Sequence, residues 1–334
     1  MITIYDIAQK TGFSPTTVSK VFNGYSDVSE KTRRKILDAA DELGYVPNAH
    51  ARSLTTKRSW TIGVLFIESS GAGILHPYFG GVIEGFKRVA TSKGYDLMFI
   101  SKDIGGKKSS YLEHCKIRGI DGVVVVLPDA SDPYFQELLE SDIPCVLLDQ
   151  ESTLKSTVYS DNAEGVRQAV AYLHSLGHRK IAHIGGGPTF AGEQRLSGYR
   201  QAMQELGLTI HPQHIVQGSY DYTVESGSKA MEELLQADER PTAVFAAGDN
   251  LAVGAMMAMK RHGLRVPEDI SLVGFDDIEM AKFLTPALTT VRQNTYVLGS
   301  RAADMLIYSI EGGEDVQQDV IPVELVIRDS CRSL

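Results

Sequence analysis

The sequence predicts an α/β protein in which a small helical segment precedes two doubly wound parallel-sheet subdomains. The chain has 334 residues, and at about 150 residues per domain this length favours roughly two domains with a full core in each. Residues 1–60 show helical periodicity, whereas beyond Trp60 apolar runs alternate with helical stretches. Parallel strands that are covered by helices on both faces have this second pattern.

Three short helices are expected in the first sixty residues. The first starts at Thr3, where an acidic residue three positions later completes a capping-box pattern, and it ends near Lys10. The second, PTTVSKVF, follows the capping residue Ser14 and has proline at its first position, where a missing N–H costs nothing. The third starts at Ser29 and ends at Gly44. We expect the three helices to share one small core.

The first two helices are joined by a glycine-containing turn of about three residues. This arrangement describes a helix-turn-helix, whose second helix enters the major groove of DNA; an ordinary helical hairpin is the alternative. In the second helix Pro15, Thr16 and Lys20 are candidates for reading base edges, and Arg33 is a candidate phosphate contact. The candidate DNA contacts in this segment are Thr3, Tyr5, Ser14, Pro15, Thr16, Thr17, Ser19, Lys20, Asn23 and Arg33.

The segment after Pro47 extends the pattern. Asn48 can cap AHARSLTT, a helix so short that it should be marginal in water by itself. The stretches TIYDIAQKTGFSPTTVSKVFNG, VSEKTRRKILDAADELGYVPN and ARSL resemble the headpiece and hinge of the LacI/GalR bacterial transcription repressors. The resemblance implies a hinge helix that folds when two subunits meet on operator DNA, with Leu54 as a wedge in the minor groove. Such a wedge unstacks a base step and gains a kinked duplex; a linker residue packing on the body is the alternative for Leu54. Arg52 is expected to contact a phosphate.

Beyond Trp60, eight apolar runs are expected to be strands: TIGVLFI, YDLMFIS, GVVVVL, PCVLLD, STVYSD, KIAHIG, TAVFAAGD and SLVGFDD. The segments between them are long enough for crossover helices. The family resemblance continues to the last residue and implies two subdomains of the periplasmic-binding-protein type. The expected domains are a helix-turn-helix headpiece at 1–47, a hinge helix and linker at 48–59, an N-terminal effector subdomain at 60–161 and 293–320, and a C-terminal effector subdomain at 162–292 and 321–334.

Candidate ligand contacts follow the ends of predicted strands, where open parallel sheets bind ligands. Carboxylates there can accept hydrogen bonds from the hydroxyls of a polyol, an arginine can donate to its oxygens, and aromatic rings can stack on it. For each of these residues taken singly, a helix cap or a core position is the alternative. The candidates are Phe79, Asp149, Asp161, Arg195, Tyr220, Asp249 and Asp276.

The resemblance weights these candidates unevenly. Asp149, Arg195 and Asp276 fall where the family's effector contacts lie, and two aromatic residues, Phe79 and Tyr220, match its pocket wall. The family's frequent Asn-Asp pair is Gly248-Asp249 here, so one amide contact is absent and a standard hexose is disfavoured.

Several classes of protein lack their signatures in this chain. The GGGPTF stretch lacks the third glycine of a dinucleotide fingerprint and is expected to be a strand-to-helix turn. No phosphate-binding loop, metal-spaced histidine cluster or nucleophile elbow occurs in the sequence, so neither an enzyme, a cofactor nor a metal is expected. The 3 cysteines lie far apart, which fits a reducing, cytoplasmic setting. No signal segment or long apolar stretch indicates secretion or a membrane span.

Charge is distributed unevenly along the chain. The net charge is -9, but residues 1–60 hold nine basic and six acidic residues, a net +3, whereas the remaining residues carry -12. A cationic segment on an anionic body can bind phosphates while the body is repelled by them. The sequence therefore predicts a homodimeric repressor of a pseudo-palindromic operator, controlled by a small polar metabolite such as a sugar or sugar derivative. The alternatives are control by a protein partner or a purine-like corepressor and, from another class, a solute-binding protein.

Overall fold

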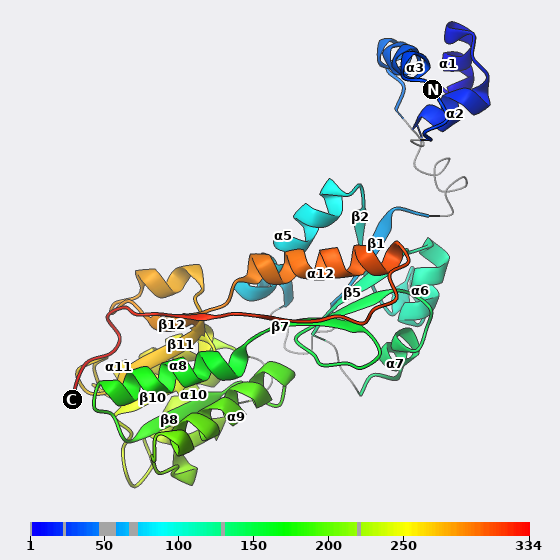
Figure 1. Ribbon diagram of the computed structural model, residues 1–334. Helices are drawn as coiled ribbons and strands as arrows, with labels where there is room; N and C mark the ends of the chain where they lie inside the picture. Colours follow the sequence, from blue (N-terminus) through cyan, green and yellow to red (C-terminus); the bar gives the residue numbers. More distant parts are fainter. Residues whose placement is uncertain (1, 23–24, 47–57, 67–72, 128–130, 219–221) are drawn as a thin grey trace. The chain divides into compact units, whose positions relative to one another are not determined.

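The computed structural model describes residues 2–22, 25–46, 58–66, 73–127, 131–218 and 222–334 (Figure 1). The chain divides into two compact units, Met1–Thr61 with Gly119–Asp121 and Ile62–Arg118 with Gly122–Leu334. The expected hinge helix lies outside the described residues. The predicted fold class is confirmed: helices precede two mostly parallel sheets.

The amino-terminal unit holds three helices, α1 (Ile4–Thr11), α2 (Pro15–Phe22) and α3 (Glu30–Leu43). Gly12 and Gly44 end α1 and α3 in the left-handed conformation, with φ of 77° and 65°, which glycine adopts without steric cost. The helices share the expected small core, which is formed by Ile7, Ala8, Val18, Val21, Ile36, Ala39 and Ala40.

The first lobe of the larger unit is built on a six-stranded sheet with the order β13-β7-β6-β5-β1-β2. Its strands are β1 (Thr61–Phe66), β2 (Asp96–Ile100), β5 (Gly122–Val126), β6 (Cys145–Leu148), β7 (Ser156–Ser160) and β13 (Gln318–Ile321). The helices of this lobe are α5 (Pro77–Ser92), α6 (Tyr111–Arg118), α7 (Pro133–Leu139) and α12 (Thr295–Ile310), with the short elements η1 (Gly73–Leu75), β3 (Asp103–Ile104) and β4 (Lys107–Lys108). Helix α12 packs on β5, β6 and β7 and against α5.

The second lobe repeats this plan with the strand order β14-β12-β11-β10-β8-β9. Its strands are β8 (Ile181–Gly185), β9 (Ile215–Gln217), β10 (Ala243–Ala246), β11 (Ser271–Asp276), β12 (Thr289–Arg292) and β14 (Glu324–Val326). Its helices are α8 (Asn162–Ser175), α9 (Phe190–Glu205), α10 (Val224–Leu234) and α11 (Asp249–Arg261), with η2 (Pro212–His214) and η3 (Glu279–Phe283). The pairing of β12 with β14 is antiparallel, whereas β8, β9, β10, β11 and β12 pair in parallel.

Both faces of the second sheet are buried. Ile181 and Phe245 pack with α8 and α9, whereas their chain neighbours Ala182 and Val244 pack with α10 and α11. Alternate residues of a strand point to opposite faces, so a nearly continuous apolar run is what a doubly covered strand needs.

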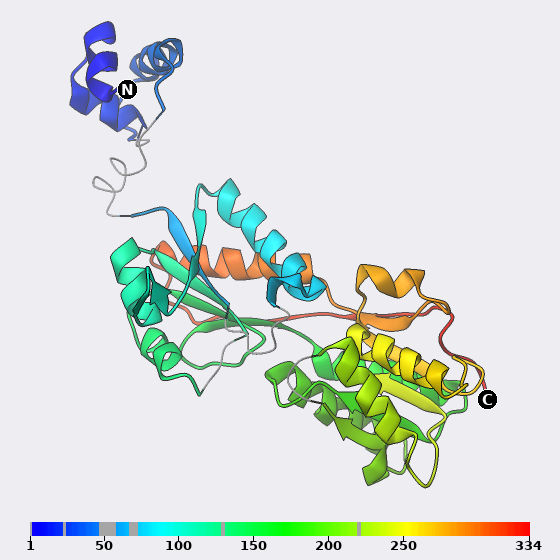
Figure 2. The same ribbon diagram turned by 180° about the vertical axis from the view of Figure 1, so that it is seen from behind.

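The chain passes between the two sheets three times. It leaves the first sheet after β7, returns to that lobe between β12 and α12, and crosses again between β13 and β14. Figures 1 and 2 show the last of these segments beside β7, with which β13 pairs in parallel. The crossings place residues 160–162 and 293–294 where the lobes meet.

Candidate functional site

Helix α2 exposes polar side chains opposite its buried stripe. Val18 and Val21 enter the core, whereas Ser14 and Thr16 are exposed. Ser14 caps the helix, since its Oγ accepts from the backbone N–H of Thr17 at 3.1 Å. Pro15, Thr17, Ser19 and Lys20 are half-buried. The helix can therefore approach DNA with Thr16 foremost.

At the start of α1 the predicted capping box is present. The Asp6 carboxylate accepts from the backbone N–H of Thr3 at 2.7 Å and from its hydroxyl at 2.8 Å. These hydrogen bonds lower the pKa of Asp6. Tyr5, the next candidate DNA contact, is 69% exposed.

Two of the candidate cations already have partners within the headpiece. Lys20 is ion-paired with Asp27. Arg33 donates to the backbone carbonyl oxygens of Val21 at 3.2 Å and Tyr25 at 2.6 Å, so it holds the chain at the end of α2. Sequence reasoning offered Arg33 only as a phosphate contact and missed these bonds. Asn23, Arg52 and Leu54 lie outside the described residues.

In the first lobe the candidate ligand contact Asp149 follows β6. Its carboxylate accepts from the hydroxyl of Tyr78, on α5, at 2.5 Å. Burial raises the pKa of Asp149, while the hydrogen bond and the charge of Arg195 oppose that rise. Asp149 has a φ of 52°, a left-handed conformation that is uncommon outside glycine and that clusters at ligand sites.

In the second lobe Arg195, on α9, lies at the centre of a polar network. Its side chain is buried, with 4% exposed. Its Nε donates to Asn162 Oδ1 at 2.8 Å and its Nη1 donates to the carbonyl oxygen of Ala247 at 2.6 Å. The guanidinium stacks on the ring of Phe275 at 3.8 Å and lies 3.9 Å from the carboxylate of Asp276. These contacts fix the orientation of the arginine.

Asp276 ends β11 with a φ of 118°. Its Oδ1 accepts from the side-chain amide of Gln293, at the second crossing, at 2.6 Å. Two buried polar atoms at the crossings have no hydrogen-bond partner among the described residues. They are Gln293 Oε1 and the hydroxyl of Ser160. Buried polar atoms of this kind normally meet a ligand or water.

The two lobes contribute to one polar cluster. The charges of Arg195 and Asp276 both act on the pKa of Asp149, although the aspartate belongs to the other lobe. Asp149, Arg195 and Asp276, three of the candidates from the sequence, thus share one site. Tyr78, Ser160, Asn162 and Gln293 were missed, and only Tyr78 had a signal, as the neighbour of the candidate Phe79.

The remaining candidate ligand contacts have structural partners or lie outside the described residues. Asp161 caps α8 by accepting from the N–H of Glu164 at 3.1 Å. Asp249 is fully buried, and its two oxygens accept from the hydroxyl of Thr290 at 2.6 Å and the N–H of Ile278 at 2.8 Å. Phe79 packs edge-on against Phe66 with ring centroids 5.1 Å apart. Tyr220 lies outside the described residues.

Another tyrosine comes close to the cluster. The ring of Tyr222 covers Gly186 and Gly248, since a Cβ built on either glycine would lie 2.3 Å and 3.0 Å from ring atoms. Gly248 has no side chain and therefore leaves room for this ring.

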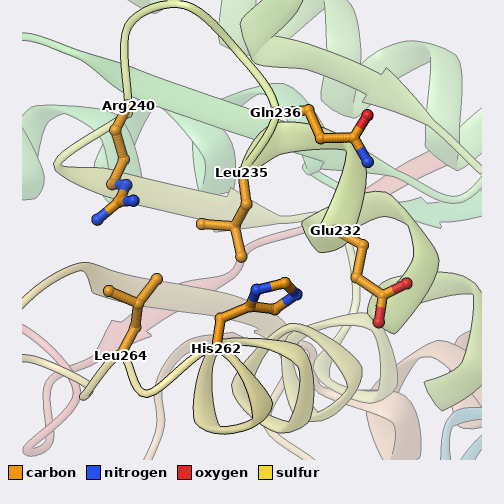
Figure 3. A pocket seen from close by; sticks show the side chains of 6 residues that line it. All are labelled: Glu232, Leu235, Gln236, Arg240, His262 and Leu264. Atoms are coloured by element: carbon orange, nitrogen blue, oxygen red, sulfur yellow. The ribbon is translucent and has the colours of Figure 1, made fainter.

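The described residues of the larger unit line at least two cavities. One of about 690 Å³ is lined from both lobes by Leu75, His76, Pro77, Asn250, Ile278, Glu279, Met280 and Phe283. The other, of about 300 Å³, lies between the ends of α10 and α11 (Figure 3) and is lined by Glu232, Leu235, Gln236, Arg240, His262 and Leu264. Glu232 there accepts from Arg261 at 2.6 Å. The first cavity is open to solvent, since its lining residues Leu75 and Phe283 are 87% and 71% exposed.

No grouping of side chains among the described residues could hold a metal ion. In the same part of the chain, no helix is long and apolar enough to cross a membrane.

A helix-turn-helix headpiece on a two-lobed ligand-binding body defines the class of ligand-responsive DNA-binding regulators. Residues 3–48 match the profile of bacterial regulatory proteins of the lacI family, and residues 170–331 match that of a periplasmic binding protein-like domain. The repressor PurR of Proteus mirabilis is 39% identical over 99% of this chain and 97% of its own. The chain belongs to the lacI family and is a DNA-binding transcriptional repressor with a ligand-binding domain.

Solved structures agree with this assignment. The lac repressor dimer bound to operator and the anti-inducer ONPF has a TM-score of 0.81 and 29% identity, covering 99% of both chains. The complex of the transcriptional regulator CelR with cellobiose has a TM-score of 0.73 and 32% identity, covering 99% of this chain and 100% of that one. The resemblance expected from the headpiece motifs is thus confirmed over the whole chain.

Proposed function

We propose that this repressor binds a pseudo-palindromic operator as a homodimer in the cytoplasm and that a neutral sugar or sugar derivative binds between its lobes and controls it. The observation that supports the ligand class is the polar cluster of Asp149, Arg195 and Asp276. The Asp276 carboxylate lies 3.9 Å from the guanidinium, and the charge of that guanidinium also acts on the Asp149 carboxylate. With two carboxylates and one guanidinium, the cluster accepts hydroxyl donors well and disfavours an anion such as a phosphate. The cellobiose complex of a relative agrees with this choice.

Unsatisfied polar atoms strengthen the proposal. The hydroxyl of Ser160 and the Oε1 of Gln293 are buried without a partner among the described residues. A polyol can donate to the amide oxygen and pair with the hydroxyl, which recovers the desolvation cost of both atoms. These two residues lie at crossings between the lobes, so a ligand that binds them would favour one arrangement of the crossings.

The switch requires a ligand that prefers one arrangement of the lobes strongly. Shifting the ratio of the two arrangements from about 99:1 to 1:99 requires a ligand that binds one arrangement roughly 10⁴-fold more tightly than the other, a difference of about 5.5 kcal/mol. Several charge-assisted hydrogen bonds that form in only one arrangement supply this difference.

A purine-like corepressor is the second candidate. Tyr222 and Phe79 offer aromatic rings in this part of the body, and a flat base can stack on such rings. PurR relatives are consistent with this alternative. Control by a protein partner is the third, and it predicts that no small molecule stabilises the chain.

The homodimer is supported by exposed apolar side chains in the body. Leu75 is 87% exposed and Phe283 is 71% exposed, and Met257 and Met280 are also exposed. Large apolar side chains in solvent are typical of a contact surface. The lac repressor structure is a dimer on its operator.

A thermal-shift screen of sugars, sugar derivatives and nucleobases tests the ligand class. A ligand at 100 times its dissociation constant stabilises the native state by about 2.7 kcal/mol. We expect a neutral sugar or derivative to raise the melting temperature of the wild-type chain. A response to nucleobases alone would contradict the proposal.

Arg195→Ala should abolish that ligand's thermal shift without unfolding the chain, because the guanidinium is the central donor of the cluster. Arg200→Ala, an exposed arginine on the same helix, is the matched control and should keep the full shift. An Arg195→Ala variant that is folded and keeps wild-type ligand affinity by calorimetry would remove Arg195 from the site.

A further inference from the structure

Asp121 holds the chain at the point where β1 begins. It precedes β5, and its carboxylate accepts two successive backbone N–H groups, Ser59 on Oδ1 at 2.9 Å and Trp60 on Oδ2 at 2.8 Å. Its own N–H donates to the carbonyl oxygen of Thr61 at 3.0 Å. One aspartate therefore makes three hydrogen bonds to three consecutive residues of the chain that follows the headpiece.

Further bonds lock the same short segment. The N–H of Thr61 donates to the hydroxyl of Ser59 at 3.1 Å. Trp60 has a φ of 59°, a left-handed conformation that a bulky aromatic residue rarely adopts. Such a conformation persists only where surrounding contacts over-determine it. The carboxylate of Asp121 supplies those contacts, because two adjacent N–H groups converge on it.

The support for Asp121 is rigid. The next residue, Gly122, starts β5 and pairs with Ile62 of β1 in parallel register. A Cβ on Gly122 would lie 2.8 Å from Ile310 and 3.0 Å from Leu306, so β5 and α12 are in close contact there. Ile120, on the other side of Asp121, is buried. Asp121 therefore lies between a buried residue and the first residue of a strand.

We propose that Asp121 is a positioning residue for operator recognition: it clamps Ser59 and Trp60 and so fixes the direction in which the chain runs from β1 toward the headpiece. Specific binding needs two headpieces at set half-sites, so it depends on that direction. Non-specific binding depends on charge and does not. This inference rests on the assigned role as a DNA-binding repressor and goes beyond the proposed effector.

The test uses the full-length chain and the variant Asp121→Asn. The asparagine keeps the size of the side chain, but its NH₂ group faces an N–H donor, so at least one clamp bond is lost. The specific probe is a duplex that the wild-type protein enriches from a random-sequence library, and the non-specific probe is a scrambled duplex of the same length. Trp60 is the only tryptophan in the sequence, so its emission and its quenching by acrylamide report on the clamp directly.

We expect Asp121→Asn to bind the enriched duplex about ten-fold more weakly, as the loss of a charge-assisted hydrogen bond implies. Its binding of the scrambled duplex should stay within about two-fold of wild type, because the phosphate contacts are unchanged. Trp60 quenching should rise. Asp96→Asn, an exposed aspartate at the start of β2 in the same lobe, is the matched control and should behave as wild type in all three measurements.

Wild-type affinity for the enriched duplex together with raised Trp60 quenching would overturn the proposal, because the clamp would then be lost without consequence. Unchanged quenching would overturn it too. If Asp121→Asn does not fold, Asp121→Glu decides: its longer side chain displaces the carboxylate from the two N–H groups, so specific binding should weaken by about two- to five-fold, and wild-type affinity together with raised Trp60 quenching would count against the clamp. Failure of the operator proposal would instead appear as no enrichment by the wild-type protein.

Discussion

His183 shows how a single buried residue can set the response of this protein to acid. The imidazole is fully buried in β8 and stacks between the rings of Tyr199, at 5.2 Å, and Phe245, at 5.5 Å. Burial lowers its pKa to about 3. The ring is therefore neutral in the folded protein throughout the range in which an exposed histidine would gain a proton.

Replacing His183 by phenylalanine should flatten the pH dependence of stability. Below the unfolded pKa of about 6.5 the unfolded chain binds a proton that the folded chain excludes, so wild-type stability falls as the pH drops from 7 toward 3. At pH 5 the loss from this residue is about 2 kcal/mol. Denaturant unfolding at pH 8 and pH 5 measures it. His262→Gln, at an exposed position, is the control and should show the same loss of unfolding free energy between pH 8 and pH 5 as wild type. If His183→Phe also showed the full wild-type loss, His183 would not be its source.

Most of the site residues that the sequence did not predict carry amide or hydroxyl side chains, and no pattern in the sequence marks them. Asp149, Arg195 and Asp276 could be picked out because they lie at predicted strand ends or on a facing helix and because the family resemblance gave these three more weight than the other candidates. Gln293 could not, because it follows β12, a strand of only four residues. Amides and hydroxyls are common in loops, and only the three-dimensional path of the crossings brings them to the cluster.

At the scale of elements, close helix pairs recur in the two lobes. A Cβ on Gly85 of α5 would lie 2.3 Å from the carbonyl oxygen of Tyr296, and one on Gly299 of α12 would lie 1.9 Å from that of Val82. Gly227 of α10 and Gly254 of α11 make equally close approaches in the second lobe. Each pair therefore packs backbone against backbone, which only glycine allows.

Gly85→Ala should destabilise the protein by about 1–3 kcal/mol, because the added methyl meets the backbone of α12 and the helices must separate. Gly80→Ala lies on the same helix, where the nearest atom would be 3.8 Å away, so it should be neutral or stabilising by up to about 1 kcal/mol. Thermal unfolding of both variants checks the contrast. Equal melting temperatures for the two would rule out the close approach.

Apolar runs were predictable as strands, and mixed segments were not. The eight predicted strands are all present because each carries an apolar run, which is buried in most of them, whereas β2 has Asp96 and Phe99 exposed. The strands β9, β12, β13 and β14 mix polar and apolar residues over only three or four positions, too few to show a period of two. Their pairing partners lie far away in sequence, so the register emerges only in the folded sheet.

At the scale of the whole molecule, charge separates the headpiece from the body. Residues 1–60 carry a net +3 within a chain of net charge -9. We therefore expect a few cations near the helix-turn-helix to neutralise phosphates. Lys20, which is paired with Asp27 in the chain without DNA, is a candidate for this role as well as for reading base edges.

Affinity for the enriched duplex should consequently fall by at least about ten-fold between 50 and 200 mM salt. Lys20→Gln should reduce the slope of log affinity against log salt by about one for each headpiece that loses a phosphate contact. Lys282→Gln, on the body, should leave the slope unchanged, and filter binding at several salt concentrations compares the two. An equal slope for Lys20→Gln and wild type would assign Lys20 to another role.

The late position of β13 and β14 in the chain has a consequence for biosynthesis. Each is an edge strand of a different sheet, and residues 318–326 supply both. A ribosome must therefore translate residues 318–326 before either lobe can complete its sheet. A premature stop codon ahead of residue 318 would leave two unfinished lobes rather than one, each with an open hydrogen-bonding edge that invites aggregation.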